Sequence, residues 1–90
     1  MYEVKPSNRF RKDLKVIAKR GYDTNLLTQV IKTLAIGENL PDKHKDHFLS
    51  GNWSNYRECH IAPDWLLVYK IESDILVLTL TRTGTHSDLF

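Results

Sequence analysis

The chain has 90 residues, of which 41% are hydrophobic and 27% charged, so it can form one ordinary globular domain, residues 1–90, around a modest core. No apolar run approaches the roughly 20 residues of a membrane-spanning helix, and the N-terminus lacks the basic start and apolar stretch of a signal peptide. The single cysteine, Cys59, excludes an internal disulfide. We therefore expect a cytoplasmic protein with no membrane association.

The net charge of +2 is unevenly distributed along the chain. Residues 1–45 contain ten Lys or Arg against five Asp or Glu, whereas residues 46–90 contain three against six. A dense basic segment attracts polyanions such as RNA, although a merely solvated helix face has the same composition. The candidate RNA-binding residues are Arg9, Arg11, Lys12, Lys15 and Lys19.

The N-terminal part predicts a strand followed by a helix. Residues 2–5 form a short strand that ends at Pro6, which cannot donate to a strand ladder. Ser7 is a plausible N-cap for a helix whose apolar residues then recur at helical spacing. Gly21 fits the position at which a helix commonly ends.

A second helix follows after a cap at Asp23 or Thr24. It has an apolar stripe wide enough to be a buried face, made of Leu26, Leu27, Val30, Ile31 and Leu34. Gly37 ends this helix. Because only two or three residues connect the two helices, we expect them to form an antiparallel hairpin.

Beyond the second helix, the pattern changes to a loop and then to strands. Residues 38–52 are rich in turn formers and predict a long loop, of the kind that often carries functional residues. Three predicted strands cover residues 53–61, 65–72 and 75–82. Since the turns between them are short, the strands form an antiparallel meander, and residues 83–90 form a tail.

These elements predict an α+β fold in the order β-α-α-β-β-β. The helical hairpin packs on one face of a small, mostly antiparallel four-stranded sheet. The other face has no helix to cover it. The loop of residues 38–52, the tail of residues 83–90, or a partner must therefore shield it.

Histidines and an acidic residue lie near the predicted strand ends. Histidine titrates near neutrality, so His47, His60 and His86 could supply a general base and a general acid if they converge on the uncovered face. Asp64 follows His60 in the next turn and could orient a histidine or carry a proton. Each histidine alone could equally be a surface or structural residue.

Two arginines and two aromatic residues complete the candidate site. Arg57 and Arg82 could bind phosphate and stabilise its charge. Trp65 and Phe90 could stack on unpaired bases, which is how many proteins hold single-stranded RNA. An ion pair within the fold could instead explain Arg57, and Trp65 could belong to the core.

The sequence contains no strong metal or cofactor motif, and we predict neither. A zinc site could be assembled only from a weak set: His44, His47, His60 and Cys59. Cys59 beside His60 could be a thiolate nucleophile, although a small buried side chain is the simpler interpretation. No glycine-rich phosphate loop or Ser-His-Asp signature is present.

Three blocks of sequence resemble a known family. They are residues 45–51 (KDHFLSG), 57–69 (RECHIAPDWLLVY) and 82–90 (RTGTHSDLF). In this order and spacing they resemble the YafQ-like branch of the RelE/ParE toxin superfamily, and the resemblance covers almost the whole chain. It implies a helical hairpin against a four-stranded sheet. One departure is Phe48, where relatives commonly have proline.

The resemblance also implies an activity and an active-site set. The family's toxins are ribosome-dependent endoribonucleases that cut mRNA in the A site without a metal, the 2′-hydroxyl attacking the adjacent phosphorus and the 5′-oxygen leaving. The matching residues are His47, His60, Asp64, Trp65, Arg82, His86 and Phe90.

Roles within this set follow from the same resemblance. We expect Arg82 to stabilise the phosphate charge and His86 to activate the 2′-hydroxyl. His60 with Asp64 would protonate the leaving oxygen. His47 is a second acid–base candidate or a phosphate contact. The division of acid and base roles among the histidines stays open at this point.

Partners are implied by the family as well. We expect a cognate antitoxin similar to DinJ, which forms a heterotetramer with the toxin. The complex would bind operator DNA through the antitoxin. The free toxin would contact the ribosome and mRNA. The alternative is a non-enzymatic toxin that poisons DNA gyrase, like the ParE branch. A regulatory RNA- or DNA-binding protein is a third possibility, but no helix-turn-helix pattern supports it.

Overall fold

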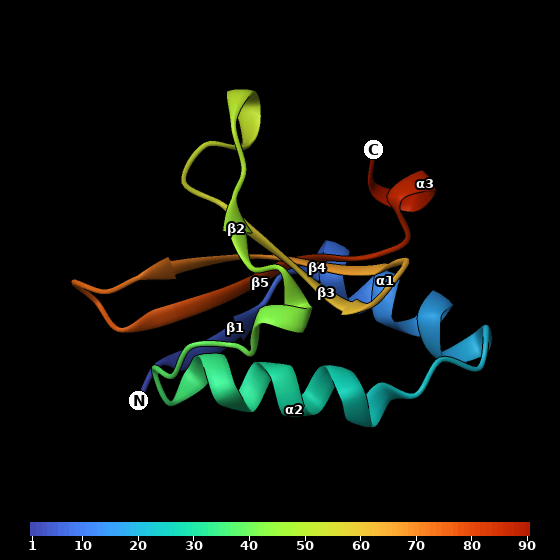
Figure 1. Cartoon of the computed structure of the whole chain (residues 1–90), viewed down its shortest axis with the longest axis horizontal. Helices are drawn as coiled ribbons and strands as arrows, with labels where there is room; N and C mark the ends of the chain where they lie inside the picture. Colours follow the sequence, from blue (N-terminus) through green and yellow to red (C-terminus); the bar gives the residue numbers. More distant parts are fainter.

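The computed structural model describes all 90 residues and shows a twisted sheet with two helices on one face (Figure 1). The elements, in chain order, are β1 (Glu3–Pro6), α1 (Asn8–Lys19), α2 (Thr24–Ala35), η1 (Asp42–His44), β2 (His47–Phe48), η2 (Gly51–Trp53), β3 (Arg57–Ala62), β4 (Trp65–Glu72), β5 (Val77–Gly84) and α3 (His86–Leu89). None of the helices has the length and apolar character needed to cross a membrane.

Capping explains where α1 begins and ends. The Ser7 hydroxyl accepts a hydrogen bond from the N–H of Phe10 at 3.0 Å, as the sequence predicts. Gly21, just after the helix, has a φ of +83°, a conformation that glycine adopts without steric cost. Phe10 and Ile17 are buried against the sheet, while the basic residues of α1 stay exposed.

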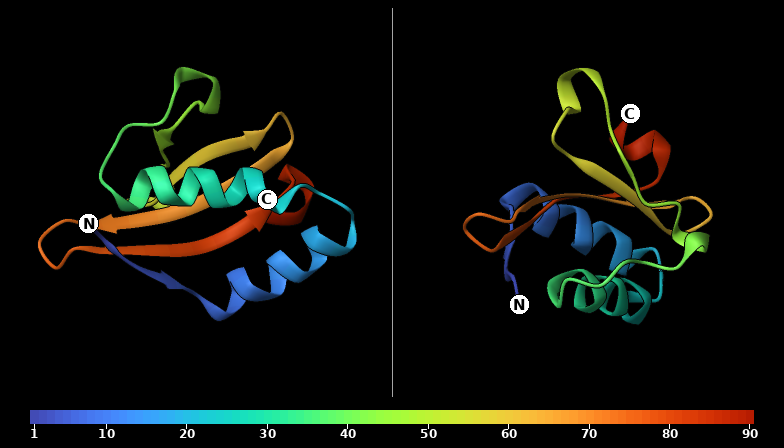
Figure 2. Two further views of the ribbon diagram at one scale, coloured as in Figure 1. Left: turned by 90° about the horizontal axis from the view of Figure 1, so that it is seen from below. Right: turned by 60° about the vertical axis from the view of Figure 1, so that its left-hand side comes forward.

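The second helix is capped by Asp23, whose carboxylate accepts a hydrogen bond from Asn25 N–H at 3.0 Å. Its predicted apolar stripe is confirmed in part, because Leu27, Val30 and Leu34 are buried whereas Leu26 stays exposed. Residues 20–23 connect the two helices, which is slightly longer than predicted. Both helices cover the same face of the sheet (Figure 2).

The sheet has the strand order β1-β5-β4-β3-β2. The predicted α+β architecture and the antiparallel meander of β3, β4 and β5 are confirmed, and β1 pairs with β5 in parallel. The number of strands is five rather than four, because His47 and Phe48 in the predicted loop pair with Glu58 and Arg57. Two residues are too few to show a strand pattern in the sequence.

Two strand boundaries also differ from the prediction. β3 begins at Arg57, because Trp53 lies in the short turn η2. β5 begins at Val77, because Ile75 and Leu76 lie in the turn after β4, where Leu76 has a φ of 53°. Their apolar side chains predict a strand, but both side chains are exposed at the tip of the hairpin.

The core lies between the sheet and the helices. Alternate residues of β4, including Trp65, Leu67 and Tyr69, pack into it together with Ile17 and Leu27 of the helices. On the opposite side of the sheet lie the segment containing β2 and η2, and the C-terminal α3 (Figure 2). Loop and tail therefore both lie over the face that lacks helices, as two of the three sequence alternatives propose.

Candidate active site

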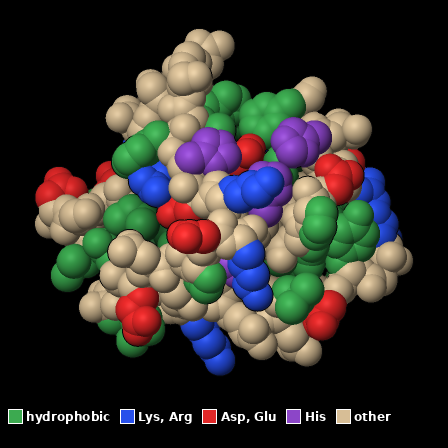
Figure 3. Space-filling model, viewed as in Figure 1, with side chains coloured by type: hydrophobic (Ala, Val, Ile, Leu, Met, Phe, Trp, Pro, Cys, Tyr) green, Lys and Arg blue, Asp and Glu red, His purple; other side chains and the backbone are tan.

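The candidate site lies on the sheet face opposite the helices, where β3 ends and α3 begins. Along β3, Cys59 and Ile61 are buried in the core. Since side chains alternate along a strand, Glu58 and His60 point to the other face. The ring of His60 lies 6.1 Å, centroid to centroid, from the ring of His86. Figure 3 shows histidine side chains gathered on this face of the molecule.

His86 is placed by the way α3 starts. Thr85 is the N-cap of α3, and it exchanges hydrogen bonds with Asp88 in a complete capping box. His86 is therefore the first helical residue, and its Nδ1 lies 3.5 Å from Oδ1 of Asp64 in the β3–β4 turn. The carboxylate thus accompanies His86, whereas the sequence analysis assigned Asp64 to His60.

His60 makes a different contact. Its Nδ1 lies 3.3 Å from the backbone oxygen of Pro63. A carbonyl oxygen can only accept, so a hydrogen bond here requires the proton on Nδ1, and in the neutral ring Nε2 is then the nitrogen with a free lone pair. In His60 and His86 alike, Nδ1 faces an acceptor and Nε2 is free to react.

His47 extends the site along the sheet. It lies directly opposite Glu58 in the β2–β3 pair, with Nε2 3.5 Å from the glutamate Oε1. Nδ1 of His47 is 2.6 Å from the backbone oxygen of Lys45. Glu58 is only 5% exposed, and the sequence analysis did not include it. The available signal was strand alternation, which puts Glu58 on the same face as His60.

Two aromatic side chains, Phe90 and Trp53, lie beside His86, and we call them the aromatic wall. Phe90 is 59% exposed, and its ring centroid lies 6.4 Å from that of His86 and 6.0 Å from that of Trp53. Trp53 in turn meets Tyr56 edge-on at 5.5 Å. Trp53 was also missed as a site residue by the sequence analysis, which placed it at the start of a strand.

Arg82 is held by the first helix. Its Nε and Nη2 donate to the Asp13 carboxylate at 2.7 and 3.1 Å, and its side chain is 16% exposed. Hydrogen bonding to Asp13 raises the pKa of Arg82 further above its usual value, so the guanidinium is a permanent cation. Only Nη1 has no hydrogen-bond partner within the chain and could meet a phosphate.

Trp65 differs from the sequence prediction. It is 1% exposed, meets Tyr22 edge-on at 5.2 Å, and donates its indole N–H to the Thr83 hydroxyl at 2.9 Å. Trp65 therefore has no free face on which a base could stack. Its observed contribution is to join β4, β5 and the helix connection beneath the site.

Arg57 also lies outside the histidine cluster. It shares the core-facing side of β3 with Cys59, and its Nε and Nη2 donate to the Asp46 carboxylate at 3.3 and 2.9 Å. Nε also donates to the Tyr69 hydroxyl at 3.2 Å, and the guanidinium lies 4.2 Å from the Phe48 ring centroid. These contacts support the ion-pair interpretation of Arg57 rather than substrate binding.

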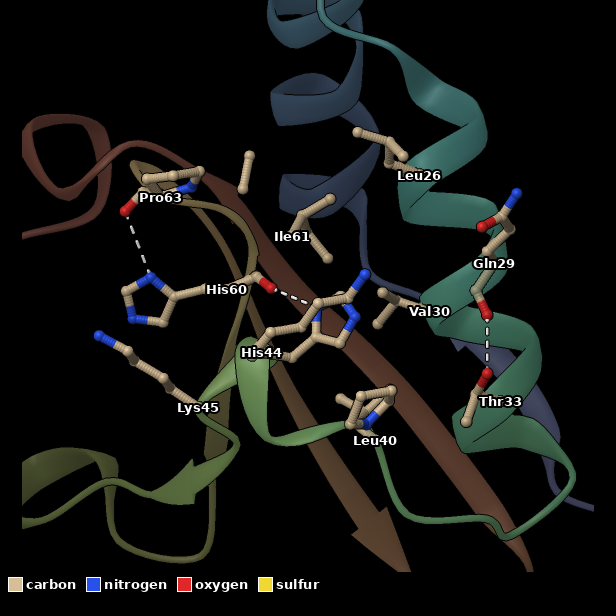
Figure 4. A pocket seen from close by; sticks show the side chains of 13 residues that line it. Leu26, Gln29, Val30, Thr33, Leu40, His44, Lys45, His60, Ile61 and Pro63 are labelled. Atoms are coloured by element: carbon tan, nitrogen blue, oxygen red, sulfur yellow. Dashed lines mark hydrogen bonds between the residues drawn. The ribbon is translucent and has the colours of Figure 1, made fainter.

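A groove of about 720 Å³ opens next to the histidine cluster, between α2, η1 and the end of β3 (Figure 4). His44 forms part of its wall, with Nδ1 2.6 Å from the backbone oxygen of His60. In Figure 4 the Lys45 side chain extends toward the His60 ring. Lys45, whose φ is 48°, lines the same groove as His60, and the sequence analysis did not include it.

No three His, Cys, Asp or Glu side chains lie together in a way that could hold a metal ion. The residues of the weak zinc set are dispersed, since Cys59 is fully buried in the core whereas His47 is exposed on β2. Burial raises the pKa of the Cys59 thiol far above its usual value, so Cys59 is not a thiolate nucleophile.

Comparison with known proteins identifies the family. The family described as "Bacterial toxin of type II toxin-antitoxin system, YafQ" matches residues 2–90. The chain belongs to the YafQ toxin family. It is 41% identical to "mRNA interferase toxin YafQ" of Escherichia coli K12 over 90 residues, covering 98% of this chain and 95% of the relative.

Solved structures of similar proteins agree with this assignment. A "metal-bound toxin from Helicobacter pylori" has 46% identity and a TM-score of 0.94, with 100% of both chains covered. The toxin in an E. coli DinJ–YafQ complex has 38% identity and a TM-score of 0.92, covering 100% of this chain and 99% of that one.

The YafQ-family set expected from the motifs is only partly assembled. The structure brings His60, Asp64, His86 and Phe90 together around α3. His47 lies farther along the sheet face, opposite Glu58. Arg82 reaches toward α1, as its hydrogen bonds to Asp13 show.

Proposed function

We propose that this YafQ-family toxin is an mRNA interferase, a ribosome-dependent endoribonuclease that cleaves mRNA in the A site without a metal. The relative from E. coli carries the name mRNA interferase toxin. The observation that carries the proposal is the pair of histidines, His60 and His86, at 6.1 Å with Asp64 beside His86. Two imidazoles at this spacing can remove one proton and deliver another across a single phosphate.

The proposed reaction assigns one proton transfer to each histidine. Nε2 of His86 removes the proton of the 2′-hydroxyl, and the 2′-oxygen attacks the adjacent phosphorus. The bond from phosphorus to the 5′-oxygen then breaks, and His60 protonates that oxygen. Asp64 stabilises the imidazolium that forms on His86, in the way a carboxylate orients a catalytic histidine.

The negative charge that develops on the phosphate needs a cation. Arg82 can offer Nη1 from a fixed position, since Asp13 holds its other nitrogens. Lys45 lines the groove together with His60 and can offer a second charge (Figure 4). We assign charge stabilisation to both.

The substrate would be held by the aromatic wall. Phe90 and Trp53 present ring surface next to His86, and unpaired bases stack well on aromatic side chains. His47, at the other end of the site, is suited to contact the phosphate of a neighbouring nucleotide or to act as a second acid–base group.

The exposed basic side chains of α1 would contact the ribosome. They are Arg9, Arg11, Lys12, Lys15 and Lys19. Ribosomal RNA is the polyanion that such a surface attracts. We further propose an antitoxin similar to DinJ, a heterotetramer, and operator binding through that antitoxin. The DinJ–YafQ complexes among the similar structures support the antitoxin proposal.

The decisive test adds purified protein to translating ribosomes and maps mRNA ends by primer extension. Wild-type protein is expected to produce cuts in register with codons, and His86→Ala and His60→Ala are expected to abolish them while thermal unfolding stays cooperative. Protein freed of transition metals should cut at the same rate with the ribosomal Mg²⁺ retained. Intact mRNA together with inhibited DNA supercoiling would support a gyrase poison instead.

A further inference from the structure

Arg20 and Asp88 connect the end of α1 to the C-terminal helix α3. Arg20 is the C-cap residue of α1, and Asp88 lies in the single turn of α3. Nη1 and Nη2 of Arg20 donate to the two carboxylate oxygens of Asp88 at 2.7 and 3.1 Å. This bidentate geometry is the strongest form of the Arg–carboxylate contact.

The same carboxylate also takes part in the N-terminal capping box of α3. Oδ2 of Asp88 accepts hydrogen bonds from the backbone N–H of Thr85 at 2.9 Å and from its hydroxyl at 3.0 Å. The bonds from Arg20, and next those from Thr85, hold the pKa of Asp88 well below its usual range. Asp88 is therefore a permanent anion that joins the cap of α3 to the end of α1.

The chain leaves little freedom around this contact. A Cβ added at Gly84 would lie 3.0 Å from both Cβ and Oδ2 of Asp88, so the carboxylate packs against the bare glycine backbone. One helical turn is too short to be stable by itself, and α3 buries none of its residues. Its position must come from contacts with the rest of the protein.

We propose that Arg20 and Asp88 are positioning residues, which hold α3 so that His86 faces His60 and Asp64. The inference rests on the proposed ribonuclease function for its kinetic consequence. His86 lies two residues before Asp88, so a rotation or fraying of α3 would move its ring directly. Displacing a reacting group by about 1 Å can reduce the rate by about 100-fold.

The contact is suited to positioning rather than to global stability. Arg20 is partly exposed, and exposed ion pairs contribute little to the free energy of unfolding. Removing the pair should therefore free α3 while the sheet and the two long helices remain folded. Positioning predicts a fall in kcat with KM nearly unchanged, because the proposed RNA-binding surface of α1 keeps its other cations.

The test is a double-mutant cycle with Arg20→Ala and Asp88→Asn. Asparagine keeps an oxygen that can cap α3 but loses the charge that Arg20 binds. We expect each single variant to lower kcat by about 10- to 100-fold. The double variant should be no slower than the slower single variant, since both remove the same contact. Arg20→Lys, which keeps the charge, should restore part of the rate, and Lys32→Ala on α2 is the matched control with unchanged activity.

A second measurement makes the result independent of catalysis. Histidine-selective NMR on the full chain should show that contacts between the His86 ring and Asp64 disappear in Arg20→Ala and Asp88→Asn, while the His44 signals stay unchanged. Retained contacts in both variants would overturn the inference. Lost contacts with unchanged kcat would overturn it as well. If the wild-type protein cuts no RNA, the proposed function fails, and the NMR result alone decides whether the pair positions His86.

Discussion

The carboxylate of Asp13 holds the guanidinium of Arg82 through hydrogen bonds of 2.7 Å to Nε and 3.1 Å to Nη2. The same carboxylate accepts the backbone N–H of Thr83 at 3.2 Å. Both side chains are largely buried, so neither charge can easily find water if the other is removed. The only acidic residue of α1 is thus used to fix a cation of the proposed site.

Replacing Asp13 with Asn should therefore destabilise the protein and reduce cleavage. We expect the free energy of unfolding to fall by about 2 kcal/mol, because a buried charge-assisted pair is broken. Urea unfolding measures this loss. Glu38→Gln, at an exposed position after α2, is the control and should change stability by less than about 0.5 kcal/mol. Equal losses in both variants would contradict a special role for Asp13.

Tyr69→Phe should loosen the segment that carries His47. The Tyr69 hydroxyl donates to Asp46 and accepts from Nε of Arg57, and the residue is fully buried. Loss of this hydroxyl leaves buried polar groups unpaired and should cost about 2 kcal/mol.

Hydrogen exchange measures the local effect of Tyr69→Phe. Amides of residues 46–49 should exchange faster, because β2 is anchored to the sheet through Asp46. Tyr56→Phe is the matched control, since its hydroxyl has no hydrogen-bond partner in the chain. Unchanged exchange in β2 would show that the two-residue strand is held by its backbone pairing alone.

Lys45→Met should lower kcat without unfolding the protein. The substitution keeps an unbranched side chain of nearly the same length and removes the charge that extends toward His60 (Figure 4). Loss of one charge-stabilising group typically costs about 100-fold in kcat. Lys43→Met, on the neighbouring groove wall, is the control and should retain the wild-type rate. Equal rates for wild type and Lys45→Met would leave Arg82 as the phosphate-binding cation.

The pH dependence of stability should report on Asp88. Its pKa is lowered in the folded state, chiefly by hydrogen bonds from Arg20. A group with a lowered folded pKa contributes stability that is fully present above its unfolded pKa, about 3.9 for Asp, and is lost as pH falls toward the folded pKa. The difference in unfolding free energy between wild type and Asp88→Asn is small because the pair is partly exposed, and it should be constant above pH of about 5 and shrink below about 4. A difference that grows on acidification would contradict this assignment.

Charge reversal on α1 should weaken ribosome binding. Arg11→Glu, Lys12→Glu and Lys15→Glu change exposed side chains only. Each lost phosphate contact lowers the slope of log affinity against log salt by about 1. Sedimentation with ribosomes at several salt concentrations measures both affinity and slope. Binding with an unchanged slope would mean that α1 is only a solvated face.

Local signals explain why so much of the fold could be predicted. Ser7 and Asp23 cap their helices as expected, and each cap bonds a backbone N–H no more than three residues later, so it can be recognised from a short stretch of sequence. β2 could not be predicted, because two residues carry no strand pattern and the neighbouring Asp46–Arg57 ion pair joins residues 11 positions apart. The exposed apolar pair at residues 75–76 was assigned to a strand because periodicity does not report exposure.

The site was predictable to the extent that strand geometry determines it. Alternation along β3 separates Arg57 from Glu58 and His60, so a stricter use of that rule would have excluded Arg57 and included Glu58. The partners of Arg82 and Trp65 are tertiary. Asp13 lies 69 residues before Arg82, and Thr83 lies 18 residues after Trp65. No local pattern contains such contacts.

The parallel pairing of β1 with β5 has a consequence for the order of folding. Val4 pairs with Leu78, and the Ser7 hydroxyl donates to the backbone oxygen of Thr81, so the first strand waits for the last one to be synthesised. Contacts so distant along the chain form late and make folding slow. The sheet therefore gains β1 only after both helices and strands β3, β4 and β5 have been synthesised.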